Sequence, residues 1–175
     1  MKVTDLTTNE YNPFYETYIA KVSDDITLLE GFIEAKTQVE NFFKSIPHDK
    51  LEYRYAKDKW SIKEVFQHII DNERVFMYRC FRMARHDKTP LAGYEQNDYI
   101  LPSGANKKSI ASLIEEYQVV RQNFIVLVKS LSSQDLEVIG TASGSAMSAR
   151  AAAFITLGHE IHHINIIKER YFKSA

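Results

Sequence analysis

Three of the six histidines lie in one five-residue run, His159–His163, which reads HEIHH. Residues four positions apart lie on the same face of a helix, so His159 and His163 can bind one metal ion together. The flanking residues are mostly apolar, and burying two imidazoles among them without partners would cost a few kcal/mol. A shared metal ion would satisfy both. Taken alone, the pair is equally compatible with two ordinary histidines. His162 points about 60° away from His159 and about 100° away from His163 on a helical wheel, so we expect it beside the site or at the surface.

His68 is the candidate third ligand. It lies between Phe66 and Ile69, at the border of the apolar face of a predicted helix. A boundary histidine that hydrogen-bonds a neighbour fits this position equally well. If its helix faces the one carrying His159 and His163, the three imidazoles form a site with at least one open coordination position. An open position is typical of catalytic rather than structural metals.

Glu160 is a candidate catalytic residue. The run around it matches the zinc-protease motif H-E-x-x-H, in which the glutamate acts as general base. The longer protease pattern fails, because Ile166 and Glu169 stand where a glycine and a third histidine are required. We therefore expect no protease. Glu160 stays a candidate neighbour of a metal-bound water, with a place on the helix surface as the alternative.

Other polar side chains could serve the same site. Asp71 and Asn72 follow His68 by three and four positions, close enough to orient its imidazole or a bound water. Asp71 is thus a second candidate catalytic residue, and a solvated helix face is the alternative for both. Four arginines form a basic strip, which could receive the carboxylates of an anionic cofactor or be an ordinary surface stripe: Arg74, Arg79, Arg82 and Arg85. Four polar or aromatic residues belong to a loop that could cover the metal as a lid: Tyr94, Gln96, Asp98 and Tyr99.

Four helices are expected to position these groups. Six Gly and four Pro are few for this length, and they separate four windows with helical periodicity. The windows cover about residues 23–45, 61–85, 108–131 and 148–172. Ser61 and Glu64 form a capping box, and Ser148 is an N-cap candidate. Each window of about 22 residues spans roughly 33 Å, which predicts an all-α four-helix bundle.

The connections 87–107 and 132–147 are long, so a simple up-down-up-down order is not assured. We place no domain boundary and predict a single domain over residues 1–175. Gly158 interrupts the fourth window directly before His159, where the missing side chain permits close approach of a neighbour.

Composition narrows the functional classes. The chain has 22 basic and 23 acidic residues, a net charge of −1, and no basic tract, so we expect no nucleic-acid partner. The single Cys80 excludes an intrachain disulfide and any CxxC site. No apolar stretch has the length of a signal peptide or a membrane span, which predicts a soluble cytoplasmic protein without a membrane partner.

The sequence resembles the DinB-like (DinB/YfiT) family of metalloenzymes. The resemblance rests on the run Lys59–Arg74 (KWSIKEVFQHIIDNER), on Thr89–Leu91 (TPL) and on Gly158–His163 (GHEIHH), and it extends from about Tyr15 to Phe172. It implies a four-helix bundle in up-down-down-up order. It also implies a divalent metal, commonly zinc or nickel, held by His68, His159 and His163, and dimers are frequent in the family.

Relatives with assigned activities resemble transferases and isomerases that use bacillithiol or mycothiol. The resemblance therefore implies a metal-dependent transfer of a thiol cofactor to small electrophilic molecules, with metal-assisted hydrolysis as the alternative. A non-catalytic metal-binding bundle is the competing class. The sequence leaves the substrate, the metal and the oligomeric state open.

Overall fold

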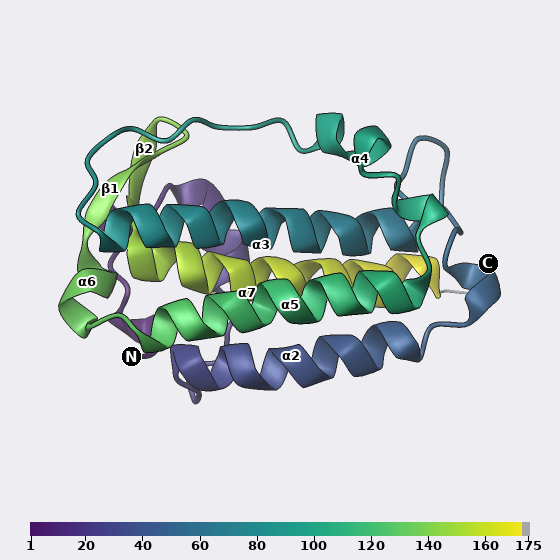
Figure 1. Cartoon of the computed structure of the whole chain (residues 1–175), viewed down its shortest axis with the longest axis horizontal. Coiled ribbons are helices and arrows are strands. Elements are labelled where there is room, and N and C mark those ends of the chain that lie inside the picture. The colour runs from purple at the N-terminus through teal and green to yellow at the C-terminus, as the bar shows by residue number, and fades with distance from the viewer. Residues whose placement is uncertain (173–175) are drawn as a thin grey trace.

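Four long helices run side by side in the computed structural model, which describes residues 1–172. They are α2 (Leu28–Lys44), α3 (Ile62–Ala84), α5 (Ile110–Lys129) and α7 (Ala149–Ile166). In Figure 1, α2 and α7 run in one direction and α3 and α5 in the other. The expected all-α bundle with up-down-down-up order is therefore confirmed. No helix among residues 1–172 is long and apolar enough to cross a bilayer.

Local capping signals set where these helices begin. The Ser61 hydroxyl accepts a hydrogen bond from the Glu64 amide (3.2 Å), and the Glu64 carboxylate accepts one from the Ser61 amide (2.7 Å), so the predicted capping box is confirmed. Ser148 caps α7 as predicted. The first long helix begins five residues later than expected, at Leu28, because Thr27 caps it in a reciprocal pair with Glu30.

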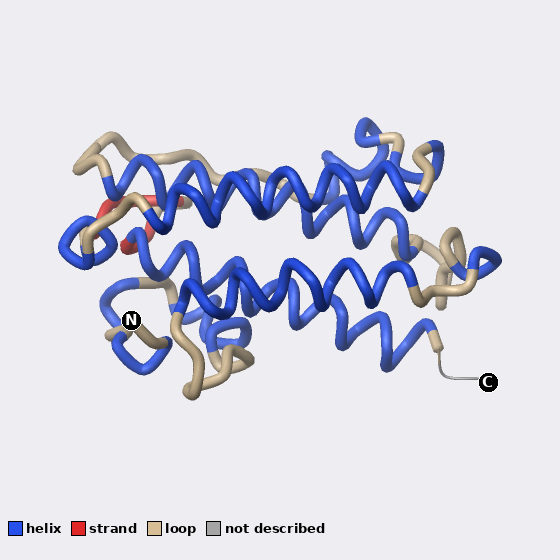
Figure 2. The backbone as a smooth tube through the Cα atoms, turned by 60° about the horizontal axis from the view of Figure 1, so that its bottom comes forward, coloured by secondary structure: helices blue, strands red, loops and turns tan. Residues whose placement is uncertain are grey.

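The two long connections have structure of their own (Figure 2). Residues 85–109 return along the bundle and contain α4 (Asn97–Ser103) and a 3₁₀ turn (Ala105–Lys107). The second connection contains α6 (Ser133–Glu137) and a hairpin of β1 (Ile139–Ala142) and β2 (Ser145–Ser148). The two-residue turn Ser143–Gly144 has positive φ at both positions, which suits the twist of a tight hairpin. Leu91 pairs with this hairpin through two backbone hydrogen bonds, of 2.9 and 3.0 Å.

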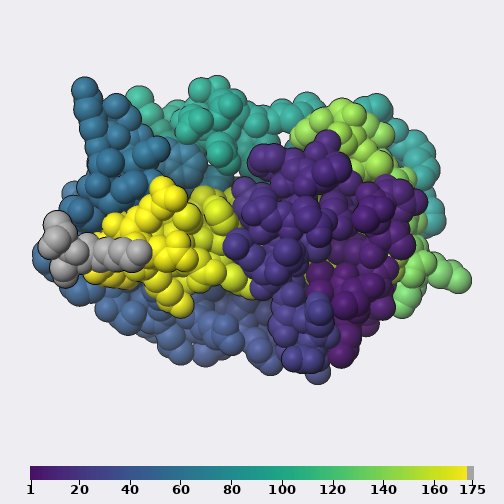
Figure 3. Space-filling view, turned by 180° about the vertical axis from the view of Figure 1, so that it is seen from behind, coloured from purple at the N-terminus to yellow at the C-terminus, as the bar shows by residue number. Residues whose placement is uncertain are grey.

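The N-terminal residues cover the outer face of α7. Figure 3 shows this segment lying on the last long helix. It consists of three 3₁₀ turns (Val3–Asp5, Thr8–Glu10 and Pro13–Tyr15) and α1 (Glu16–Ile19), which packs on α7. Because α7 has neighbours on all sides, residues 149–160 are all buried, which explains why this helix is apolar all round. A 3₁₀ turn (His48–Lys50) precedes α3, and a π-helical turn (Ile167–Tyr171) follows α7.

A polar layer divides the core into two apolar clusters. One cluster lies toward the hairpin and includes Phe32, Phe124 and Phe154; the other lies toward the opposite end and includes Phe43 and Phe66. The layer between them consists of buried charged and imidazole side chains from three of the long helices: His68, Glu73, Arg121, His159 and Glu160. The functional candidates therefore occupy the middle of the bundle.

Candidate metal centre

The three predicted ligands meet in the structure. His68 comes from α3, and His159 and His163 come from adjacent turns of α7, which packs against α3. The Nε2 atom of His159 lies 3.0 Å from Nε2 of His68 and 3.1 Å from Nε2 of His163. One ligand nitrogen from each of the three lies within 4.8 Å of the others.

The chemistry of this donor set fits a divalent metal ion. Burial lowers the pKa of His68 to about 4, and burial together with the neighbouring imidazoles holds the pKa of His159 and His163 well below 6.5. A neutral imidazole has a nitrogen lone pair that can coordinate a metal ion. A single Nε2 carries either one proton or one lone pair, so His159 cannot form good hydrogen bonds with both neighbours. One metal ion with Zn–N bonds of about 2.0–2.1 Å brings its ligand nitrogens roughly 3 Å apart, close to the observed spacing.

Aromatic rings enclose the histidines. The ring of Trp60 lies 4.8 Å from that of His68, and the ring of Tyr18 lies 5.3 Å from that of His159. His162 is half-buried beside the cluster, with its ring 5.1 Å from His163 and 5.3 Å from Tyr18, consistent with its expected place next to the site. Tyr18 was not among the site residues predicted from the sequence. The only signal was the close spacing of aromatic residues in the N-terminal segment.

Glu160 lies on the other side of α7, inside the bundle. Its side chain is 1% exposed, so the helix-surface alternative is wrong. Its Oε2 accepts hydrogen bonds from the Tyr117 hydroxyl (2.8 Å) and from Nη2 of Arg121 (2.8 Å). Arg121 also donates to both carboxylate oxygens of Glu73, at 2.7 and 2.9 Å. Burial raises the pKa of Glu160 to about 7 although Arg121 opposes the shift.

Asp71 and Asn72 bind neighbours other than His68. The Asp71 carboxylate accepts hydrogen bonds from Gln67 (3.0 Å) and Arg74 (2.9 Å). The Asn72 side-chain oxygen accepts one from the Tyr94 hydroxyl (2.8 Å). Its amide nitrogen is buried and has no acceptor among residues 1–172. Asn72 is therefore a free donor close to the histidines.

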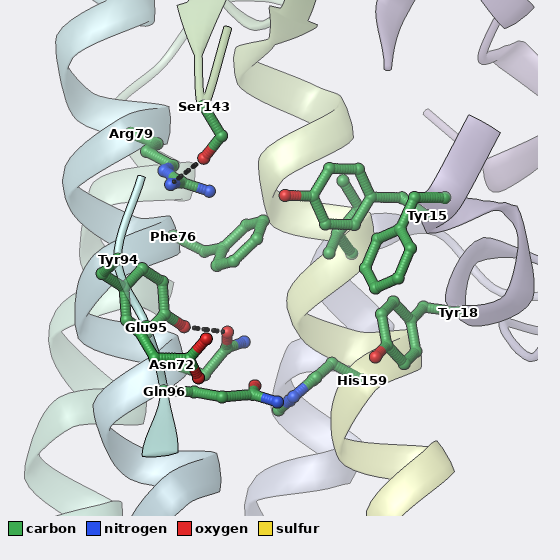
Figure 4. Close-up of a pocket in the computed structure, with 12 residues that line it drawn as sticks. Tyr15, Tyr18, Asn72, Phe76, Arg79, Tyr94, Glu95, Gln96, Ser143 and His159 are labelled. Carbon is green, nitrogen blue, oxygen red and sulfur yellow. Dashed lines mark hydrogen bonds between the residues drawn. The ribbon is translucent and has the colours of Figure 1, made fainter. Parts of the chain in front are cut away.

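Two cavities adjoin the cluster. The first, which we call the Arg79 cavity, has a volume of about 250 Å³ and includes His159, Asn72, Arg79 and Ser143 in its lining (Figure 4). The second, of about 420 Å³, is bordered by Trp60, Asn97, His162 and His163.

The four residues of the candidate lid lie beside two different hollows. Tyr94 and Gln96 line the Arg79 cavity and Asn97 lines the second cavity. Asp98 and Tyr99 line neither of these two cavities; they border a separate, more open depression with Asp71 and Arg74.

The expected basic strip separates into four different environments. Arg74 pairs with Asp71 and Glu116, and Arg82 pairs with Asp87. Arg85 lies over the Phe81 ring, 5.6 Å from its centroid. Arg79 is buried and lines the cavity. The interpretation of the four arginines as a single surface stripe is therefore wrong, because the helical period turns position 79 toward the interior.

Comparison with known proteins agrees with this architecture. Residues 32–167 match the family model of the DinB superfamily. Among solved structures, the chain is similar to YfiT from Bacillus subtilis, described as "a probable metal-dependent hydrolase with an unusual four-helix bundle topology". The two are 15% identical, the match covers 91% of each chain, and the TM-score is 0.73, a likeness that shows the fold. No curated protein matches the sequence. Since the family model spans most of its length, the chain belongs to the DinB superfamily.

Proposed function

We propose that this protein is a divalent-metal-dependent enzyme that acts on small molecules and holds its metal with His68, His159 and His163. The observation that carries the proposal is the convergence of three Nε2 atoms, one of them from His159, which lines the Arg79 cavity. Three nitrogen ligands suit zinc or nickel and leave a coordination position for a substrate. A bound metal of this kind lowers the pKa of a thiol or water, so that thiolate or hydroxide forms near neutral pH.

Transfer of a thiol cofactor of the bacillithiol type to a small electrophile is the proposed reaction. Its support is the sequence resemblance together with the free donors of the Arg79 cavity, which suit an anionic cofactor. In this reaction Asn72 and Arg79 bind the cofactor away from its thiol group, while the Tyr18 and Trp60 rings limit access of water to the histidines. Metal-assisted hydrolysis is the second candidate, favoured by the description of YfiT. Purified protein tested on a panel of thiols and electrophiles, and on ester and amide substrates, separates the two.

Glu160 and Asp71 keep proposed roles in catalysis, each through its neighbours. Glu160 shares hydrogen bonds with Tyr117 and Arg121 behind the histidines, and Asp71 holds Gln67 and Arg74 beside His68. Loss of turnover with retained metal in Glu160→Gln or Asp71→Asn would support these roles. We also propose a cytoplasmic homodimer, which sedimentation of the purified protein tests for its oligomeric state.

Metal content tests the central proposal. We expect one metal ion per chain in the purified protein by elemental mass spectrometry. His163→Ala should lose it, whereas His162→Ala, which removes an imidazole just outside the cluster, should retain it. A native protein without metal, or equal metal content in the two variants, would overturn the proposal. A fourth protein ligand in the X-ray absorption spectrum, with no turnover on either panel, would favour a non-catalytic metal-binding bundle.

A further inference from the structure

We infer that Arg79 is a specificity determinant, which binds a carboxylate at the end of the substrate or cofactor remote from the reacting group. The inference rests on the proposed function, since it places the reacting group of the same molecule at the three histidines. It deepens that proposal by naming the substrate class: an elongated small molecule with an anionic end.

Arg79 is a buried cation without an anion. Its side chain is among the largest fully enclosed ones, and the residue is 2% exposed. No carboxylate of residues 1–172 lies within 4.0 Å of its guanidinium. Glu95 lines the same cavity, but it is exposed and forms no ion pair with Arg79. The other two buried arginines, Arg121 and Arg150, each bind two glutamates. A buried charge without a partner is costly, so a bound anion would compensate Arg79 as glutamates compensate the other two.

The contacts of Arg79 leave donors free for a ligand. Its Nη2 donates to the Ser143 hydroxyl (2.8 Å) and to the Ala92 carbonyl (3.3 Å). The guanidinium carbon lies 4.8 Å from the Phe76 ring centroid and 5.9 Å from that of Tyr94. These neutral contacts fix the orientation of the guanidinium. Nε and Nη1 have no hydrogen-bond partner among the described residues, and the side chain lines the cavity.

Asn72 supplies a second donor in the same cavity. Its side chain is 4% exposed, its oxygen is occupied by Tyr94, and its amide nitrogen has no acceptor among residues 1–172. Figure 4 shows Asn72 between Arg79 and His159 along the cavity. Two buried donors in one cavity call for a ligand rich in acceptors, as a carboxylate or a peptide-like backbone is.

The position of Arg79 on α3 defines the shape of the ligand. Asn72 follows His68 by four residues and Arg79 follows it by eleven, which at about 1.5 Å per residue places the Cα atoms roughly 6 and 16 Å further along the helix. A ligand that reaches both the histidines and Arg79 must therefore be elongated. Its anionic end cannot be the reacting group itself.

The experiment compares matched charged and neutral probes. The probes are 6-mercaptohexanoate and 6-mercaptohexanamide, titrated into the purified metal-containing protein by calorimetry. We expect the carboxylate to bind at least about tenfold more tightly than the amide, because a charge-assisted bidentate contact is lost in the amide. Arg79→Gln should reduce this ratio to near one, and Arg79→Lys should restore part of it. Equal affinities in the wild type, or an unchanged ratio in Arg79→Gln, would overturn the inference.

Two controls separate binding from a merely structural role. Ser143→Ala removes the hydroxyl that orients Arg79 but keeps the charge, so the preference for the carboxylate should persist. Should Arg79→Gln fail to fold, the nitrogen-15 NMR signal of the Arg79 guanidinium in the wild type must shift with 6-mercaptohexanoate and stay in place with the amide. An unshifted signal with both probes would overturn the inference.

Metal analysis of the same samples distinguishes the two proposals. A preference for the carboxylate in protein that binds no metal at His68, His159 and His163 would leave the role of Arg79 standing and refute the metalloenzyme. One metal ion per chain, together with equal affinities for the carboxylate and the amide, would support the metalloenzyme and refute the role of Arg79. Hexanoate and hexanamide titrated into chelator-treated protein give the same comparison without a thiol or a metal.

Discussion

The carbonyl oxygen of Tyr18 lies 2.0 Å from the position that a Cβ atom on residue 158 would occupy. Gly158 is therefore required for α1 to lie against α7, next to His159. An added methyl group would have to displace backbone rather than a flexible side chain. The helix accepts the low propensity of glycine, about 1 kcal/mol relative to alanine, in exchange for this contact.

Gly158→Ala should destabilise the fold by about 3 kcal/mol despite its better helix propensity, because the N-terminal segment is pushed away from α7. Urea unfolding measures the change. Gly31→Ala is the matched control in α2: its Cβ would meet the side-chain ends of Leu157 (3.0 Å) and Ile26 (3.3 Å), which can move. An equal loss of stability in both variants would contradict the close approach at Tyr18.

Arg121→Met should cost about 3–5 kcal/mol in the free energy of unfolding, because Glu73 and Glu160 would remain buried without their cation. Adding Glu73→Gln and Glu160→Gln to this variant should recover at least half of the loss. Arg74→Met is the control, since it breaks partly exposed pairs and should cost less than about 1 kcal/mol. The prediction fails if the triple variant is less stable than Arg121→Met alone.

Stability in acid should depend on Glu10. Burial raises the pKa of its carboxyl, but hydrogen bonds from Arg150 and Ser148 outweigh burial and lower the pKa to about 2. The contribution is therefore fully present above the unfolded-state pKa of 4.5 and is lost as the pH falls toward 2. Glu10→Gln should flatten the dependence of unfolding free energy on pH in this window. Glu137→Gln, which removes a more exposed partner of Arg150, should leave the dependence close to that of the wild type.

Cys80 should be unreactive in the folded protein. It is fully buried in the core, and burial raises the pKa of its thiol to about 12. We expect its reaction with a chromogenic disulfide reagent at pH 8 to be at least about a thousandfold slower than that of a free thiol, and to reach the rate of a free thiol in denaturant. Rapid labelling under native conditions would show that the core around α3 opens easily.

The features of the fold that were predictable from the sequence are those that local patterns determine. Helical periodicity located the four long helices, and Ser61 and Ser148 marked two of their starts because a cap acts within one turn. The hairpin was missed, since strands of four residues such as Ile139–Ala142 have little pattern and pair partly with the distant Leu91. Up-down-down-up order came from the resemblance and not from periodicity.

The metal site, like the fold, was predictable only where a local pattern in the sequence encodes it. Spacing brought His159 and His163 together, but the partners of Glu160 depend on how α5 slides along α7, which no local pattern encodes. The same holds for Arg79: periodicity alone did not distinguish it from Arg74 or Arg82, and only the packed bundle shows which arginine lacks an anion.

The covering of α7 by the N-terminal segment has a consequence for how the chain reaches its native state. On the ribosome, residues 1–22 emerge before the four long helices, but the helix they pack against is the last of these to be made. Until then Tyr18 lacks the rings of His159 and His162 that it packs against. Folding must close a loop of more than a hundred residues before Tyr18 meets His159, and contacts so distant in sequence slow folding. The histidine cluster is thus expected to be the last part of the molecule to assemble.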